Sequence, residues 1–262
     1  MSERVAAPAI HEAFPRYFKI AGHWVNSYKV FLCVGLYVGT LAVGALASYS
    51  GLSPLRVGLG ALSCALAGLF GARVYHLLVH APVYLRQGSW SALWDGRRGG
   101  WSVFGALLTL VPMTFIVSWL LGIPAATFWD HLGAGILAGG FWVRLGCVFN
   151  GCCVGRETQG LMGVHLHDVH CVWKRRIPVQ FMEMAWWLLG GLIFLVLWSR
   201  AYPPGSYALG VLAWYGTGRF FLEPLREKPD VIFGKLRINQ LVAALLALGA
   251  GGALWLRLAT AG

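Results

Sequence analysis

The sequence predicts an all-α integral membrane protein: a bundle of seven transmembrane helices with a small polar cap and an N-terminal interfacial arm. Hydrophobic residues make up 58% of the 262 residues and charged residues only 12%, whereas soluble domains carry about a quarter charged residues. The charges are also clustered, which leaves apolar stretches of roughly 20 residues that are long enough to cross a bilayer as helices. A soluble globular fold is therefore excluded.

Seven such stretches follow one another along the chain, and short links join most of them. They lie at 28–50, 56–80, 100–123, 125–148, 178–199, 205–223 and 237–258. This arrangement leaves no room for a separate globular domain, so we expect one membrane domain over residues 1–262.

Two segments outside the predicted spans have their own character. Residues 149–177 form the largest polar segment and should fold as a cap on one membrane face. Residues 1–27 lack the apolar core and cleavage site of a signal peptide. Because they mix aromatic with basic residues, we expect an interfacial arm on the membrane surface; an ordered lead-in to the first span is the alternative.

The net charge of +11 raises the question of the partner. In so apolar a chain it indicates attraction to anionic lipid headgroups, and we expect no nucleic acid partner. Most basic residues outside the spans lie on the N-terminal side of the bundle, which by the positive-inside rule predicts a cytoplasmic N-terminus. The 35 glycines favour close helix–helix approach. The densest glycine run within a span is Gly133, Gly135, Gly139 and Gly140.

Charged residues inside the spans suggest a functional site. Each costs roughly 2.5–3.5 kcal/mol on membrane insertion scales, so such residues usually face a protein interior or a water-filled cavity. Because successive helices alternate in direction, most of these residues should meet at one membrane face, and only Asp130 belongs to the other. The predicted polar chamber consists of Tyr28, Arg73, Arg144, Gln180, Glu183, Tyr215, Arg219 and Glu223.

The chemistry of this chamber points to an anionic ligand. Tyr215, Arg219 and Glu223 recur every four residues and therefore share a helix face. Arginine forks suit phosphate, which predicts a phospholipid headgroup site. Structural ion pairing between helices is the alternative, and spacing alone does not separate binding from catalysis.

A cysteine-rich segment follows the fourth predicted span. Cys147, Cys152 and Cys153 lie where the span ends in a glycine-punctuated turn, and Cys171 follows with three histidines. Four interpretations stay open: a metal site, a disulfide involving Cys171, a thiol made reactive by Arg144, and small residues that pack beside glycines. The spacing matches no standard metal motif, so we expect no bound metal and no cofactor.

Residues 144–156 resemble the signature of the prolipoprotein diacylglyceryl transferase family, Arg-x-Gly-Asn-Phe-x-Asn-Gly-Glu-x-x-Gly-Arg. Residues 71–75, 177–183 and 215–223 are similar to further motifs of that family, so the resemblance covers nearly the whole chain in order. The signature residues kept are Arg144, Gly146, Asn150, Gly151, Gly155 and Arg156.

The resemblance implies a multi-pass enzyme of the bacterial inner membrane that moves diacylglyceryl from phosphatidylglycerol, or a related phospholipid, to the cysteine of a prolipoprotein or to another acceptor. It also implies a periplasmic N-terminus and cap, opposite to the basic-residue count, and we follow the resemblance here. The implied catalytic residues are Arg144, Arg219, Glu223, Asn150, Cys147 and Cys152. The implied substrate-binding residues are Tyr28, Arg73, Gly151, Gly155, Gln180, Glu183 and Tyr215.

Three departures from the family pattern bear on the reaction. Phe104 stands where the family has a functional histidine, and Cys147 and Cys152 replace the signature Asn and Glu. A phenylalanine cannot transfer a proton. We therefore favour a phospholipid-dependent transferase with altered acceptor-side residues. The alternatives are a non-catalytic lipid-binding or transport relative and a thiol-redox or metal-handling membrane protein.

Overall fold

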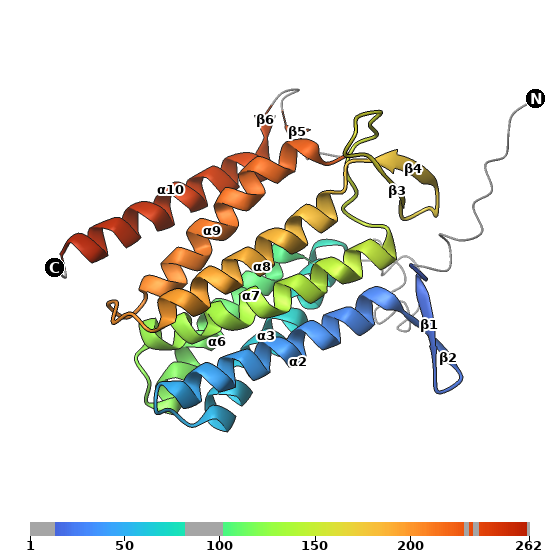
Figure 1. The fold of residues 1–262 in the computed structure, drawn as a ribbon. Helices are drawn as coiled ribbons and strands as arrows, with labels where there is room; N and C mark the ends of the chain where they lie inside the picture. Colours follow the sequence, from blue (N-terminus) through green and yellow to red (C-terminus); the bar gives the residue numbers. More distant parts are fainter. Residues whose placement is uncertain (1–13, 82–101, 228–230, 233–235, 261–262) are drawn as a thin grey trace, which may run out of the picture. The chain divides into compact units, whose positions relative to one another are not determined.

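The computed structural model describes residues 14–81, 102–227, 231–232 and 236–260, and the start of the third predicted span, residues 100–101, lies outside them (Figure 1). The chain divides into two compact units, residues 1–39 with 133–262, and residues 40–132. Helices α2 (Ser27–Tyr49) and α7 (Ala125–Asn150) each have residues in both units, and each unit is described by itself below.

Seven long helices lie within the described residues, and each begins and ends within three residues of a predicted span. Six are long and apolar enough to cross a membrane, whereas α9, at 17 residues, falls short of that length. A multi-pass helical membrane protein is thus confirmed. The helices are α2 (Ser27–Tyr49), α3 (Pro54–Val79), α6 (Val103–Leu121), α7 (Ala125–Asn150), α8 (Val179–Trp198), α9 (Ser206–Leu222) and α10 (Ile238–Ala259).

Glycines let α2 and α7 approach closely in the first unit. A Cβ atom on Gly35 would lie 2.9 Å from the Gly139 carbonyl oxygen, and one on Gly39 would lie 2.8 Å from that of Gly135. Both helices therefore carry a Gly-xxx-Gly pair at the contact, the pattern that allows backbones to touch in membranes. The expected use of Gly135 and Gly139 is confirmed.

A pair of tryptophans joins α8 to α9 in the same unit. The rings of Trp186 and Trp214 stack at 4.1 Å, and each indole N–H donates to the other residue's carbonyl oxygen, at 3.0 and 3.1 Å. Gly190 and Gly218 make room for these rings, since a Cβ on either would lie within 2.4 Å of an indole nitrogen. This contact aligns the ends of α8 and α9 that carry charged residues.

The second unit is built around α3 and α6, which pack together at Gly71 and Gly105. A Cβ atom on Gly105 would lie 2.4 Å from the Gly71 carbonyl oxygen, so both positions need a residue without a side chain. The buried core of this unit consists of Val43, Ala47, Val57, Ala61, Cys64, Val117 and Phe128.

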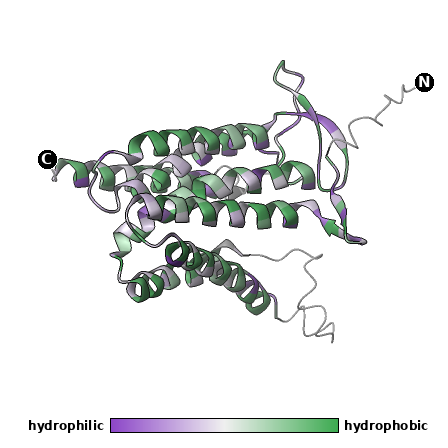
Figure 2. Cartoon of the chain, turned by 60° about the horizontal axis from the view of Figure 1, so that its bottom comes forward, coloured by the Kyte–Doolittle hydropathy of each residue, from purple (hydrophilic) through white to green (hydrophobic). Residues whose placement is uncertain are grey.

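Outside the helices, the part of the chain that the structure describes contains three short antiparallel hairpins, which the all-α prediction did not include. Figure 2 shows hydrophobic residues along the helices and hydrophilic residues mainly in the strands and loops. Polar connections of this length satisfy their backbone groups by pairing with each other. The hairpins are β1–β2 (Tyr17–Ile20, His23–Asn26), β3–β4 (Val164–His167, Trp173–Arg176) and β5–β6 (Val231–Ile232, Leu236–Arg237).

The described part of the N-terminal arm is ordered against the bundle. The rings of Phe14 and Phe18 lie 5.3 and 5.8 Å from the ring of Phe149, at the end of α7. On the same hairpin Trp24 is 70% exposed. Aromatic side chains of this kind are common at membrane interfaces, so the interfacial position of the arm stays a prediction.

Candidate functional site

Three arginines and two glutamates form a buried network where α7, α8 and α9 present their charged ends. Glu183, only 4% exposed, pairs with Arg144 (Nε–Oε2 3.1 Å), Arg219 (Nη1–Oε1 3.2 Å) and Arg226 (Nη2–Oε1 2.7 Å). Glu223, 2% exposed, pairs with Arg219 at 2.8 Å and with Arg226 at 3.6 Å. Three positive and two negative charges leave a net charge of +1. The network therefore combines both sequence interpretations, helix–helix ion pairing and a cationic site.

The sequence analysis missed Arg226 as a member of this network. Arg226 follows the short 3₁₀ helix Glu223–Leu225 and lies outside the predicted span 205–223. A signal was present, because Arg219, Glu223 and Arg226 follow the i, i+4, i+7 pattern of one helix face. The turn at the end of α9 keeps that face, so Arg226 reaches Glu183 on α8.

A small hollow beside the network has aromatic walls. Its described lining combines a guanidinium pair with indole and phenol rings, a composition that suits an amphipathic ligand. Tyr215 stacks loosely on Trp187, with ring centroids 5.7 Å apart. The lining residues are Arg144, Glu183, Trp186, Trp187, Tyr215, Gly218, Arg219 and Leu222.

The three cysteines of the signature segment meet at the end of α7. Their sulfur atoms all lie within 4.8 Å of one another, and Arg144 Nη1 lies 4.0 Å from the Cys147 sulfur. Hydrogen bonds with the Cys147 and Cys152 thiols, and then the charges of Arg226 and Arg144, hold the pKa of Cys153 below its usual value, although burial works in the opposite direction. The Cys153 thiol thus lies within the electrostatic influence of two arginines of the network.

The turn that brings the cysteines together is held from several sides. Gly151 adopts a φ of +70°, and a Cβ there would lie 2.4 Å from the Asp168 carbonyl oxygen. Asn150 accepts a hydrogen bond from the Asn26 amide at 3.1 Å, and Gln180 donates to the Cys152 carbonyl oxygen at 2.8 Å. These residues position the turn, and the catalytic role expected for Asn150 and the substrate-binding role expected for Gly151 and Gln180 stay predictions.

Gly155 and Tyr28 also lie around this turn. A Cβ on Gly155 would lie 2.2 Å from the Ile177 carbonyl oxygen, so only glycine allows the backbone at Gly155 to approach the backbone at Ile177 this closely. Tyr28, at the start of α2, lies against Gly146 on α7, one residue before Cys147. Arg73 is buried in α3 of the second unit, so its place in the predicted chamber stays a prediction.

The cap is fastened by a fully buried arginine that the sequence analysis did not single out. Arg176 at the end of β4 pairs with Asp168 at 3.4 Å and with Glu227 at 2.6 Å. Backbone hydrogen bonds also join the cap to the chain after α9: the Arg156 N–H donates to the Leu225 carbonyl oxygen, and the Glu227 N–H donates to the Val154 carbonyl oxygen. The cap is therefore tied directly to the chain that carries Arg226.

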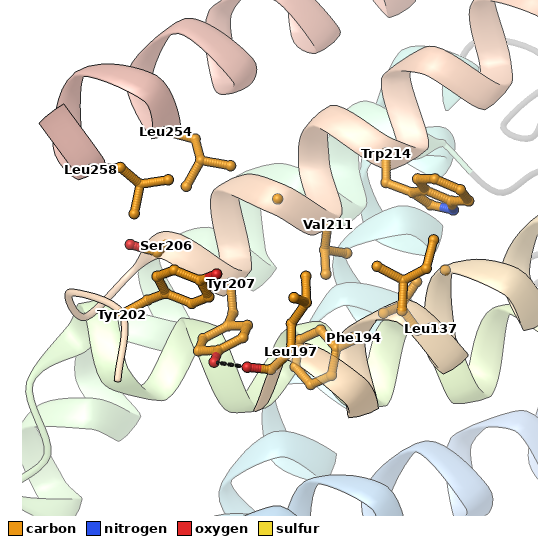
Figure 3. A pocket seen from close by; sticks show the side chains of 13 residues that line it. Leu137, Phe194, Leu197, Tyr202, Ser206, Tyr207, Val211, Trp214, Leu254 and Leu258 are labelled. Carbon is orange, nitrogen blue, oxygen red and sulfur yellow. Dashed lines mark hydrogen bonds between the residues drawn. The ribbon is translucent and has the colours of Figure 1, made fainter. Parts of the chain in front are cut away.

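A larger pocket of about 200 Å³ lies toward the other end of the same helices (Figure 3). Its described lining is almost wholly apolar and includes no acidic or basic residue, so it offers room for hydrocarbon rather than for a headgroup. At this pocket the Tyr207 hydroxyl lies within hydrogen-bond distance of two carbonyl oxygens, those of Leu197 at 2.6 Å and Arg200 at 2.7 Å. We place the functional site by its charges, at the arginine network.

Comparison with known proteins shows the family of the chain. The family model for prolipoprotein diacylglyceryl transferase matches residues 15–256. This chain belongs to that family. A phosphatidylglycerol–prolipoprotein diacylglyceryl transferase of Tropheryma whipplei is 31% identical over 192 residues, which cover 69% of each chain. Similar enzymes from Streptococcus mutans (29% over 188 residues; 69% of this chain, 70% of the relative) and Lactiplantibacillus plantarum (31% over 202 residues; 70% and 68%) also match.

The signature segment of this chain contains the cysteine turn. Arg144 and Arg156 of the signature are kept, while the cysteines stand between them. Phe104, at the position where the resemblance implies a histidine, lies exposed on α6 in the second unit. Of the retained signature residues, Arg144 lies in the arginine network. The altered positions Cys147 and Cys152 lie in the sulfur cluster.

Proposed function

We propose that this chain is a diacylglyceryl transferase of the bacterial plasma membrane, with phosphatidylglycerol as donor and a prolipoprotein cysteine as acceptor. Family membership over residues 15–256 supports the reaction class. The observation that carries the proposal is the arginine network, because its net positive charge lies beside a partly open hollow. Membrane-buried cations with an accessible side are a typical anion site.

The arginines of the network have further N–H groups that can donate hydrogen bonds to a phosphodiester. Each guanidinium carries five N–H groups, and contacts with described residues engage two nitrogens on each of Arg144, Arg219 and Arg226. The side chains of these arginines are 13–16% exposed, so a headgroup can reach them. Glu183 and Glu223 hold the forks in place before the lipid arrives, which reduces the reorganisation that binding requires.

In the proposed reaction the acceptor thiolate attacks the glyceryl carbon that carries the phosphate. A carbon–sulfur bond forms, the carbon–oxygen bond to phosphate breaks, and its electron pair leaves with glycerol phosphate. The arginines offset the negative charge that develops on the departing phosphate. Both substrates must therefore meet at the α7–α8–α9 end of the first unit.

The test uses the purified full-length protein in detergent, labelled phosphatidylglycerol and a prolipoprotein acceptor. The wild type should release glycerol phosphate and lipidate the acceptor. Arg144→Lys keeps the charge but loses the planar fork, and we expect turnover to fall about 10²-fold, the usual effect of losing one such donor. Arg257→Ala, which removes an exposed arginine from the last turn of α10, should leave turnover unchanged.

Two outcomes would contradict the proposal. Tight phospholipid binding without turnover would make the chain a lipid-binding relative of the family. Equal loss of activity in Arg144→Lys and Arg257→Ala would show that the network is not the donor site.

We also propose that α9 is a seventh span and that the N-terminal arm and cap face the periplasm. The length of α9 together with the 3₁₀ helix Glu223–Leu225 supports the span. Part of the basic excess on the cap side has a folding role, because Arg176 and Arg226 are bound in buried ion pairs. Their presence on that face therefore has a cause other than cytoplasmic orientation.

A further inference from the structure

The sulfur cluster at the end of α7 has the composition of a metal site. The three sulfurs of Cys147, Cys152 and Cys153 lie within 4.8 Å of one another, and the described residues add no fourth cysteine, histidine or carboxylate to the group. Cys147 is 3% exposed. The spacing of these cysteines matches no common motif because the turn, not a regular helix or hairpin, brings them together.

The backbone of the turn is strained in a way that serves this convergence. Cys153 adopts a φ of +60°, a left-handed conformation that is uncommon for a residue with a side chain. The Cys152 N–H donates to the Cys147 carbonyl oxygen at 3.2 Å, which folds the turn back onto the helix. Gln180 then holds the Cys152 carbonyl oxygen from α8. The sulfurs are thus positioned by three separate constraints.

The distances and charges fit a zinc-type ion. Zinc–sulfur bonds of about 2.3 Å in a tetrahedron place the sulfurs about 3.8 Å apart, so contraction of the cluster by at most about 1 Å suffices. Three thiolates with a divalent cation carry one net negative charge. Arg144 Nη1, at 4.0 Å from the Cys147 sulfur, lies where it offsets that charge.

We propose that Cys147, Cys152 and Cys153 bind one zinc(II) ion as a three-thiolate site beside Arg144. Zinc prefers four ligands, so the fourth position is left for water or an incoming ligand, as in zinc sites with three protein ligands. The site goes beyond the proposed transfer reaction and does not depend on it.

The experiment measures metal binding directly. Full-length protein is purified in detergent, reduced, stripped of metal and titrated with zinc(II) against a chelating dye, and separately with cobalt(II). We expect one equivalent of zinc and a thiolate-to-cobalt charge-transfer band. Cys147→Ser, Cys152→Ser and Cys153→Ser should each weaken zinc binding at least about tenfold.

Matched cysteine substitutions serve as controls. Cys64→Ser changes a cysteine buried in the second unit, and Cys171→Ser changes an exposed one in the cap. Both variants should bind zinc as the wild type does. If any variant of the three cluster cysteines fails to fold, the test rests on the wild type, whose cobalt complex should show the thiolate-to-cobalt charge-transfer band.

Three results would overturn the proposal. The first is that the reduced wild-type protein binds no more zinc than a variant with all three cluster cysteines changed to serine, which would show that the cluster is not a zinc site. Zinc binding that falls in Cys171→Ser, but not in Cys147→Ser, places the metal elsewhere. A cobalt complex of the wild type without a thiolate band excludes sulfur ligation.

Discussion

Among single residues, Glu183 holds the position on which the charged network depends. It is the one described carboxylate that pairs with all three arginines, from α7, from α9 and from the chain after α9. Breaking a buried ion pair by removing one partner leaves an uncompensated charge, which costs more than the pair itself contributes. Glu183 therefore links three elements and orients the arginines that we propose bind the donor.

We predict that Glu183→Gln destabilises the protein by about 3–5 kcal/mol, because three buried guanidinium groups lose their shared carboxylate. The measurement is thermal unfolding of the purified protein in detergent. Glu157→Gln is the control, since Glu157 pairs with Lys174 on the exposed cap surface, and its unfolding temperature should match the wild type. Equal unfolding temperatures for all three proteins would show that the network does not contribute to stability.

At the level of elements, glycine pairs decide which helices can lie together. The α2–α7 contact and the α3–α6 contact both leave no room for a Cβ atom, and Gly190 and Gly218 leave room only for tryptophan rings. Helix association in a membrane has little hydrophobic driving force, so close van der Waals packing is the main source of stability. Small residues at the contacts are consequently more sensitive to substitution than the large apolar residues on the outer helix faces.

We predict that Gly139→Ala destabilises the α2–α7 contact by about 1–3 kcal/mol, the usual cost of overpacking, because the new methyl would lie 2.8 Å from the Gly35 carbonyl oxygen. Gly191→Ala on α8, where a methyl meets nothing within 4 Å, is the matched control. Thermal unfolding in detergent should separate the two variants. A Gly139→Ala protein as stable as Gly191→Ala would mean that the helices can move apart at no cost.

At the level of the whole molecule, the chain combines an apolar body with charges concentrated at the ends of its helices. In the first unit, the ends of α7 and α9 and the start of α8 carry the arginine network, while the opposite ends border an apolar pocket. A lipid substrate has the same polarity, with an anionic headgroup and hydrocarbon chains. The first unit thus matches an amphipathic donor in the distribution of its charges.

We predict that the C-terminus faces the cytoplasm, as seven spans with a periplasmic arm require. A fluorescent reporter that folds only in the cytoplasm should be active when fused after α10, and alkaline phosphatase at the same point should be inactive. The same pair of reporters placed before the arm gives the opposite expectation. Active alkaline phosphatase at the C-terminus would contradict either the seventh span or the orientation.

The sequence by itself determined the spans, because a stretch of apolar residues long enough for a bilayer has no other stable place. It also placed Arg144, Glu183, Arg219 and Glu223 in one site, since alternating helices bring their ends to one face. The tertiary structure alone showed that Glu183 joins three arginines, that Arg226 is one of them, and that a strained turn gathers Cys147, Cys152 and Cys153. These contacts depend on turns and side-chain directions between elements, and hydrophobic periodicity carries no information about either.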